Sequence, residues 1–260
     1  MPRFTRTIIP RIKKSFEERG VIGSVLRCGL LPIHLYREYR LSRELRRDPE
    51  NSLFDQTYGV ETDGDIGGRT YLSDLKISSP NWPHGKDYAG VQTERFVAAM
   101  SRLDLDFENY VFIDFGSGKG RAILLASGYP FKKIVGLEFS EELHAIAQSN
   151  IRKYASAGQR CASIESICMD FTEFDLPAEP CVLYFFDPCR AKPLEQTLEN
   201  IRRSIKKSPR PVYIVYISPL EGHLFDASPV LRKTVTDTDY SFSIYESGTG
   251  GGSNSRASLL

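Results

Sequence analysis

The sequence is poor in the residues that build covalent cross-links and metal sites. Among its 260 residues are only five cysteines and four histidines. The number of cysteines is odd, and no two of them have the C-x-x-C spacing. A disulfide framework or a zinc site needs paired or closely spaced cysteines, so we expect neither, and we expect no metal. The thiols are typical of a reduced, cytoplasmic protein. They are Cys28, Cys161, Cys168, Cys181 and Cys189.

Long hydrophobic runs are also missing. The longest apolar stretch near the N-terminus, residues 21–36, is interrupted by Arg27, Pro32 and His34. A membrane-spanning helix needs about 20 consecutive apolar residues. No signal-peptide cleavage pattern follows the stretch. The sequence therefore predicts neither a membrane span nor a secretory signal.

A strong net charge of either sign is absent, since the chain carries a net charge of +1. We therefore expect no specific nucleic-acid binding. The charge is nevertheless uneven: residues 1–47 hold 12 Lys/Arg against 4 Asp/Glu, whereas the remainder holds 22 against 29. The favoured interpretation is a helical extension with a solvated basic face. The alternative is a surface that weakly contacts an anionic membrane or an acidic partner.

Composition divides the chain into four parts. Two helices are predicted near the start, over residues 12–19 and 31–47. The next part is rich in Gly, Pro, Asp and Asn, which is typical of loops. It holds the only tryptophan, Trp82, and either roofs a substrate site or serves as a linker. The parts are a basic helical extension (1–50), a loop, linker or lid (51–85), the main domain (86–246) and a flexible tail (247–260).

The most informative stretch starts with residues 111–115, which are apolar apart from Asp114 and predict a short buried parallel strand. Three glycines follow at alternate positions, and an apolar helix begins at Arg121. Glycine permits positive φ and lets the backbone approach a ligand closely. A dinucleotide fingerprint would need its third glycine at position 121, so NAD is disfavoured. The glycines are Gly116, Gly118 and Gly120.

The pattern Asp-x-Gly-x-Gly-x-Gly resembles motif I of the class I, Rossmann-like, S-adenosylmethionine-dependent methyltransferases. The resemblance implies an α/β fold, with a seven-stranded, mostly parallel sheet, helices on both faces and an antiparallel last strand. It also implies S-adenosyl-L-methionine as cofactor. The cofactor-binding residues that it implies in this stretch are Asp114, Phe115, Gly116, Ser117, Gly118 and Gly120.

Acidic residues end the next two predicted strands. Glu138 lies 22 residues after Gly116 and is placed to accept hydrogen bonds from ribose hydroxyls. A salt bridge is the alternative role. The resemblance implies that the Asp170 carboxylate binds the adenine amino group, while the backbone N–H of the next residue contacts the adenine ring. In the alternative role, the Asp170 carboxylate only caps a turn. The neighbours assigned with them to the cofactor site are Phe139 and Phe171.

A fourth strand, predicted from residue 182, ends at Asp187 and Pro188. This dipeptide resembles motif IV of amino-group methyltransferases, where Asn, Asp or Ser precedes Pro-Pro and an aromatic residue. Cys189 and Arg190 depart from that pattern and disfavour a nucleobase or glutamine amide as acceptor. We expect Asp187 to accept a hydrogen bond from an attacking amine or to take its proton. The alternative is that it only lines the cofactor pocket.

Several other residues are secondary candidates. Thr93 is predicted to cap a core-facing helix that carries apolar residues at positions 96, 97, 100 and 103. Tyr88 and Thr93 are candidates for cofactor contacts, although a capping and packing role is favoured for both. Further along, a helix cap at Ser140 is predicted. Residues that would line an acceptor site are Tyr216, Ser218 and His223, the last in a loop.

Three functions follow from these patterns. The first is methyl transfer from S-adenosyl-L-methionine to a nitrogen acceptor, with the motifs most similar to non-SET protein lysine methyltransferases and their bacterial relatives. The second is O-methylation of a small metabolite, with Asp187 or His223 as base. The third is a cofactor-binding but inactive regulatory domain. For both enzymes, the expected partner is a methyl-acceptor substrate, either a protein or a small molecule.

Overall fold

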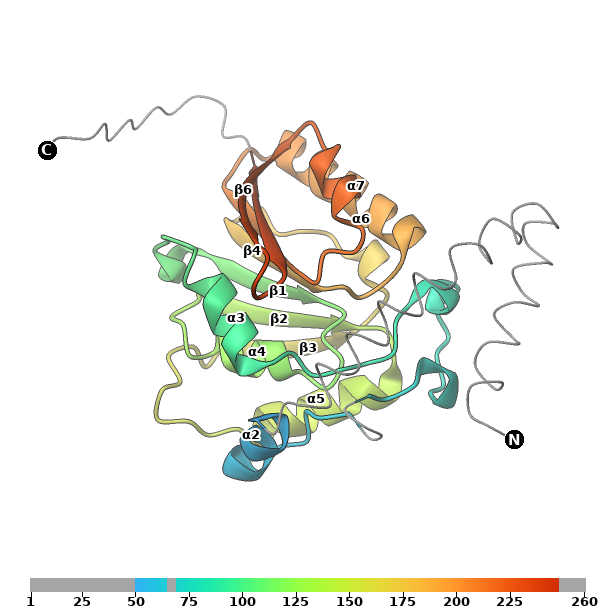
Figure 1. The fold of residues 1–260 in the computed structure, drawn as a ribbon, viewed down its shortest axis with the longest axis vertical. Coiled ribbons are helices and arrows are strands. Elements are labelled where there is room, and N and C mark those ends of the chain that lie inside the picture. The colour runs from blue at the N-terminus through green and yellow to red at the C-terminus, as the bar shows by residue number, and fades with distance from the viewer. Residues whose placement is uncertain (1–49, 65–68, 248–260) are drawn as a thin grey trace, which may run out of the picture.

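The computed structural model describes residues 50–64 and 69–247. Its strands form one seven-stranded sheet in the order β3-β2-β1-β4-β5-β7-β6 (Figure 1). Among the strands of this sheet, β7 alone runs opposite to the other six. The predicted fold class, including the antiparallel last strand, is therefore confirmed. The strands are β1 (Val111–Phe115), β2 (Lys133–Glu138), β3 (Ile164–Cys168), β4 (Cys181–Phe186), β5 (Val212–Ile217), β6 (Leu231–Asp237) and β7 (Phe242–Ser247).

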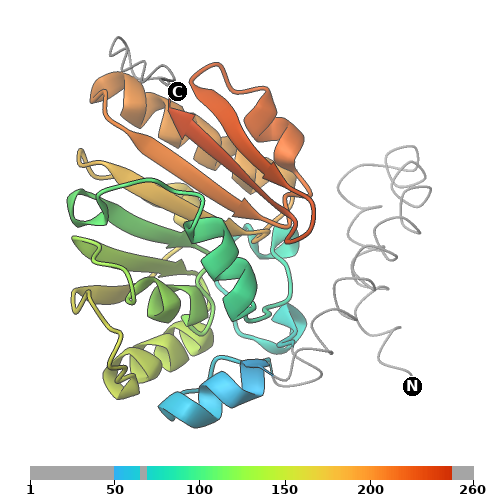
Figure 2. The same cartoon turned by 60° about the vertical axis from the view of Figure 1, so that its left-hand side comes forward.

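Helices cover both faces of the sheet (Figure 2). Successive strand residues point to opposite faces, so Phe112 of β1 packs with α3 and α4 whereas Ile113 packs with α6 and α7. Helix α5 packs beside β3, and α2 lies against it. The helices are α2 (Glu50–Tyr58), α3 (Thr93–Met100), α4 (Arg121–Ala126), α5 (Glu141–Lys153), α6 (Ala191–Lys207) and α7 (Gly222–Asp226).

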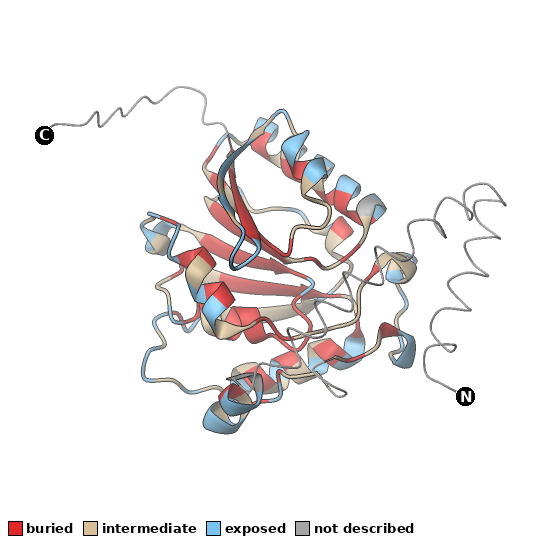
Figure 3. Ribbon diagram, viewed as in Figure 1, coloured by how far each residue is buried: buried red, intermediate tan, exposed pale blue. Residues whose placement is uncertain are grey.

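The centre of the sheet forms the core (Figure 3). All five residues of β1 are buried, and β4 and β5 are nearly so. Strands covered on both faces are apolar throughout, which explains the continuous hydrophobic runs in these segments. The edge strand β6 instead exposes most of its residues. The apolar core thus holds rigid the strand ends at which the candidate residues lie.

The segment before the sheet is more ordered than its composition suggests. The sequence predicts a loop, linker or lid over residues 51–85, and for α2 that prediction is wrong. Helix α2 is stabilised by tertiary contacts, because Phe54 packs on Tyr154 of the loop after α5. Asp55 accepts hydrogen bonds from the backbone N–H groups of Thr62 and Asp63 at 2.7 and 2.9 Å. The composition of a single segment does not reveal such partners.

Residues 69–92 form an irregular segment that we call the strap. It contains two 3-10 turns, η1 (Leu72–Asp74) and η2 (Trp82–His84). Its ends are joined by antiparallel pairing of Thr70 with Tyr88. The strap, teal in Figure 1, runs beside the carboxyl ends of the parallel strands. Two more 3-10 turns lie outside it, η3 (Phe107–Asn109) and η4 (Phe171–Glu173).

The structure corrects several local predictions. The N-cap of α3 is Gln92 rather than Thr93. Val97 is 47% exposed, so it is not a core position of that helix. His223 lies in the short helix α7 and not in a loop. The predicted cap at Ser140 is confirmed, since its hydroxyl accepts a hydrogen bond from the Leu143 N–H.

Some predictions fall outside the described residues. They concern the basic segment 1–47 with its two helices, and residues 248–260 of the tail. Within residues 50–64 and 69–247, no helix combines the length and the apolarity that crossing a membrane requires. The four cysteines in this part of the chain are thiols.

Candidate active site

The glycine loop after β1 forms a cradle of bare backbone. Gly116 and Ser117 both donate their N–H groups to the Leu137 carbonyl of β2 at 2.9 Å. The φ angles of the three glycines are 86°, 54° and 89°, a region in which other residues are strained. A Cβ on Gly118 would lie 2.1 Å from ring carbons of Tyr88, and one on Gly116 would lie 2.8 Å from Pro188. Both positions therefore require glycine.

Glu138 ends β2 next to this loop, as predicted. Its two oxygens accept hydrogen bonds from the N–H groups of Gly118 and Ser140, both at 2.8 Å. Burial raises the pKa of Glu138 to about 7, although these N–H groups oppose the shift. Each carboxylate oxygen has a second lone pair, so the group can hold the loop and still accept from a ligand.

Beside the loop lies a small pocket that opens partly to solvent. Asp114 and Tyr184 both line this pocket, and they lie opposite each other in the pairing of β1 with β4. Burial raises the pKa of Asp114 well above its ordinary value, and the nearby Glu138 raises it further. The buried hydroxyls of Ser117 and Tyr184 have no hydrogen-bond partner among the described residues. An unsatisfied buried hydroxyl costs about 1–3 kcal/mol, so these groups are suited to a polar ligand.

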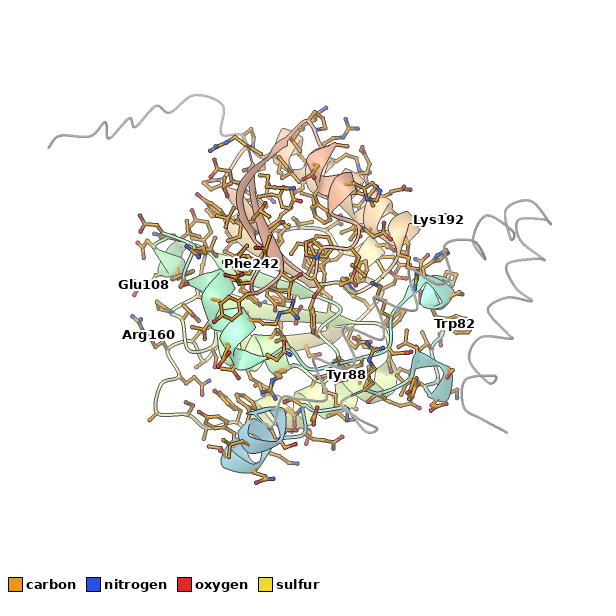
Figure 4. All side chains as sticks on the ribbon, in the orientation of Figure 1. Trp82, Tyr88, Glu108, Arg160, Lys192 and Phe242 are labelled. Atoms are coloured by element: carbon orange, nitrogen blue, oxygen red, sulfur yellow. The ribbon has the colours of Figure 1, made fainter. Side chains whose placement is uncertain are left out.

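Tyr88 closes this pocket from the strap side. Its ring packs on Gly118, and its hydroxyl donates to the Thr62 carbonyl at 2.6 Å. Figure 4 shows Tyr88 over the middle of the molecule and Trp82 at the rim. This packing is the role that the sequence analysis favours for Tyr88, and a cofactor contact stays a prediction. Thr93 is not among the residues that line the pocket.

Asp170 follows β3 and is bonded to the strap. Its carboxylate accepts hydrogen bonds from the Ser79 hydroxyl, from the Asn81 amide at 2.9 Å and from the Thr172 N–H at 2.9 Å. Burial alone would raise its pKa, but these hydrogen bonds outweigh burial and lower it. Asp170 therefore caps η4 and anchors the strap. Its neighbour Phe171 packs edge-on against Phe115 of β1.

Asp187 lies at the exit of β4, where its φ of 41° turns the chain sharply. One carboxylate oxygen forms a buried ion pair with the Lys86 ammonium of the strap. The other accepts a hydrogen bond from the Tyr216 hydroxyl at 3.3 Å. Burial raises the pKa of Asp187, and Lys86 and Tyr216 partly oppose the shift. No local signal in the sequence pairs Lys86 with Asp187, because 101 positions separate them.

The three candidates for the acceptor site have different surroundings. Tyr216 contacts Asp187 directly, as described above. Ser218 instead accepts a hydrogen bond from the buried Arg95 guanidinium at 2.9 Å. The His223 side chain is 69% exposed, and its Nδ1 lies 3.9 Å from a carboxylate oxygen of Glu221. The structure thus places only Tyr216 beside the candidate catalytic carboxylate. The described part of the chain contains no cluster of side chains suited to a metal.

Comparison with known families identifies the central part of this fold. Residues 113–209, from β1 to the end of α6, match the family described as a methyltransferase domain. The chain carries a class I S-adenosylmethionine-dependent methyltransferase domain. It is therefore a methyltransferase, and its cofactor is S-adenosyl-L-methionine. A comparison with curated protein sequences gives no match.

Solved structures of other methyltransferases resemble this domain distantly. An RNA methyltransferase from Salinibacter ruber, in complex with S-adenosyl-L-homocysteine, is 17% identical over 64% of this chain and 97% of its own, with a TM-score of 0.42. A precorrin-6y C5,15-methyltransferase from Geobacter metallireducens is 15% identical over 67% of this chain and 93% of its own, with a TM-score of 0.43. TrmN from Thermus thermophilus is 13% identical over 60% of this chain and 49% of its own, with a TM-score of 0.45. Likenesses at this distance assign no acceptor.

The residues at the glycine loop of the methyltransferase domain fit its cofactor. The amino-acid part of S-adenosyl-L-methionine carries an ammonium and a carboxylate. Asp114 suits the ammonium, because its buried carboxylate lines the pocket. The unpartnered hydroxyls of Ser117 and Tyr184 can donate to a carboxylate. Tyr184 was not among the sequence candidates, because a tyrosine inside an apolar strand has the pattern of a core residue.

Proposed function

We propose that the methyltransferase acts on an amine nitrogen, and that its acceptor is a protein lysine. The cofactor site in this proposal is formed by the carboxyl ends of β1, β2 and β3, each of which supplies an acidic residue. Asp114 would hold the ammonium and Glu138 the ribose, while Asp170 and its neighbour would meet the adenine. When bound, the sulfonium of the cofactor supplies the methyl group. The proposed cofactor-binding residues are Asp114, Phe115, Gly116, Ser117, Gly118, Gly120, Glu138, Phe139, Asp170, Phe171 and Asp187.

The observation that carries the proposal is an ammonium at the exit of β4. The Lys86 Nζ is bound to the Asp187 carboxylate, which is 3% exposed. A carboxylate buried to this degree binds a positive charge strongly, since water no longer competes for it. The position beside the glycine loop is thus already suited to a lysine side chain. Pro188, the next residue, packs directly on Gly116 of that loop.

Asp187 is also suited to proton transfer. An alkylammonium cannot attack a methyl group until it loses a proton and frees its lone pair. Burial raises the pKa of Asp187, so this carboxylate accepts a proton more readily than an exposed aspartate does. The Tyr216 hydroxyl fixes the orientation of the carboxylate by its hydrogen bond to Oδ1. Asp187 therefore has both the charge to bind an amine and the basicity to deprotonate it.

An oxygen acceptor has less support from the same site. The phenol or alcohol of a small metabolite is neutral and gains little from a buried carboxylate whose partner is an ammonium. His223, the alternative base, is largely exposed and has no described contact with Asp187. A cytoplasmic location and a contact of residues 1–47 with an anionic membrane or an acidic protein remain predictions from the sequence.

The substitution Asp187→Asn tests the proposal, because it keeps the shape of the side chain and removes its charge and basicity. We expect methyl transfer to a lysine-containing peptide to fall by about 100-fold or more, the size of a general-base effect. The affinity for S-adenosyl-L-homocysteine, measured by calorimetry, should fall far less than the rate, because the other proposed cofactor-binding residues are unchanged. Mass spectrometry of the peptide gives the rate and the methylated atom.

The control is the exposed strap residue Lys76, whose substitution Lys76→Ala should leave the rate unchanged. Undiminished turnover of the Asp187→Asn variant would limit Asp187 to lining the pocket. Methyl transfer to catechol but not to the lysine peptide would favour the O-methyltransferase. Cofactor binding without transfer to either acceptor would favour an inactive regulatory domain.

A further inference from the structure

The strap is joined to the segment after β4 as a short antiparallel strand. Gly85 pairs with Cys189. Around this pair, the Lys86 N–H donates to the Pro188 carbonyl at 3.1 Å, and the Arg190 N–H donates to the His84 carbonyl at 2.9 Å. Backbone hydrogen bonds of this kind hold an extended segment without regard to its sequence. Residues 188–190 therefore act as an edge to which an extended peptide can bind.

Lys86 uses both polar groups that the exit of β4 offers. Its backbone N–H donates a hydrogen bond to the Pro188 carbonyl, and its side-chain ammonium forms the ion pair with the Asp187 carboxylate. The lysine side chain is 17% exposed, so it lies mostly in the site. An amine acceptor that used the same carboxylate would have to displace Lys86. In this arrangement the strap occupies the place that the proposed function gives to the acceptor.

The residue before the lysine lies in a narrow space. A Cβ at Gly85 would come within 3.1 Å of the Phe139 ring and 2.8 Å of the Leu72 side chain. A segment bound in the same place therefore meets Phe139 next to its lysine. A small residue directly before the lysine would fit this position best.

We propose that the acceptor site binds a lysine within an extended peptide, which pairs with residues 188–190 in place of the strap residues 84–86. This inference rests on the proposed amine-directed function and specifies the form of its substrate. Backbone pairing supplies affinity, the Asp187 carboxylate selects the lysine, and Phe139 restricts the residue before it. The strap is then the chain's own occupant of the site, and it must yield to the acceptor.

Binding of a synthetic peptide tests this inference without any methyl transfer. The probe has the strap's own sequence over residues 80–88 and carries a fluorescent label, and a second probe has methionine in place of the lysine. The Lys86→Ala variant removes the cationic partner of Asp187 and keeps its hydrogen bond from Tyr216. We expect the lysine probe to bind this variant about tenfold more tightly than the wild type, as one charge-assisted hydrogen bond would give. The methionine probe should show no such gain.

Lys76→Ala is the matched control, since Lys76 belongs to the same strap and exposes its side chain. It should bind the lysine probe as the wild type does. Equal affinities of the lysine probe for the wild type and Lys86→Ala would overturn the inference, and so would equal affinities of the two probes for the variant. Replacing the glycine of the probe by valine should weaken binding, because of Phe139.

If Lys86→Ala fails to fold, hydrogen exchange of the wild type gives the answer. A saturating amount of the lysine probe should speed exchange of the Lys86 amide, whose hydrogen bond to Pro188 it replaces. Continued protection of this amide would contradict displacement of the strap. The binding experiment and the methylation experiment fail independently. If a free lysine amide is methylated but the probe does not bind, only the peptide mode is rejected. If the probe binds but is not methylated, only the amine-directed activity is rejected.

Discussion

Two parts of the candidate site treat their polar groups in opposite ways. They are the pocket beside the glycine loop, which we call the cofactor end, and the exit of β4 at Asp187, which we call the acceptor end. At the cofactor end, the hydroxyls of Ser117 and Tyr184 are buried without a partner in the described part of the chain. At the acceptor end, the Asp187 carboxylate is paired with Lys86 on one oxygen and with Tyr216 on the other. The first end is prepared for a ligand from solution, whereas the second is filled by the chain itself.

This difference suggests how the site is assembled. Unpaired buried polar groups reduce stability until a ligand satisfies them, so cofactor binding is expected to stabilise the fold. The Asp187 carboxylate is already stabilised by its partners. The binding free energy of a substrate at this carboxylate is therefore only the difference between its own contacts and those of Lys86. The cofactor end should thus respond strongly to ligand. The acceptor end should respond to loosening of the strap.

The largest effect is expected from closing the cofactor cradle with Gly118→Ala. The new Cβ would overlap the Tyr88 ring, and the left-handed φ of 54° strains any residue with a side chain. We expect cofactor binding to be lost and the free energy of unfolding to fall by about 3 kcal/mol. Calorimetric titration with S-adenosyl-L-homocysteine and urea denaturation measure the two quantities.

Gly158→Ala is the control for that substitution, because its Cβ would have no neighbour closer than 3.7 Å and its φ is not positive. Its effect on unfolding should stay within about 0.5 kcal/mol. Normal cofactor affinity in Gly118→Ala would show that the cradle accommodates a side chain, and the contrast between the two ends would be lost.

A pH profile tests the cost of the buried charge at Glu138, whose pKa rises from 4.5 to about 7 on folding. Between these values the folded protein keeps a proton that the unfolded chain has released, so the free energy of unfolding should decrease as pH rises. The decrease is at most about 3 kcal/mol. The Glu138→Gln variant does not titrate and should show a flatter profile in urea denaturation. Saturation with S-adenosyl-L-homocysteine should flatten the pH profile of the wild-type free energy of unfolding. If the profiles of the wild type and of Glu138→Gln are parallel, Glu138 does not cause the pH dependence.

The smallest effect is expected from Tyr184→Phe, which removes one unpartnered hydroxyl and keeps the ring. The affinity for S-adenosyl-L-homocysteine should fall about fivefold, as expected for one hydrogen bond. The free energy of unfolding of the ligand-free protein should stay unchanged or increase, since no internal hydrogen bond is lost. Tyr213→Phe, near the start of the neighbouring strand β5, is the control and should leave affinity unchanged. A loss of stability without a loss of affinity would indicate a purely structural tyrosine.

Much of the cofactor end could be predicted from the sequence. The glycine spacing and the strand-end position of Glu138 are local patterns, and parallel strands bring their carboxyl ends to one edge of the sheet. Two of the wrong predictions concern contacts made at a distance. Val97 has the helical spacing of a core residue but is exposed, and α2 forms because it packs on α5 and the loop that follows it. Local patterns give the direction of a side chain but not whether another element covers it.

The sequence by itself determined the family of the domain, its cofactor and the row of acidic strand ends, because these follow from spacings of a few residues along consecutive strands. Only the tertiary structure decided that the strap closes on Asp170 and Asp187. Those contacts join residues about 90 to 100 positions apart. They depend on how the loops fold over a finished sheet, and no periodicity in the chain encodes them.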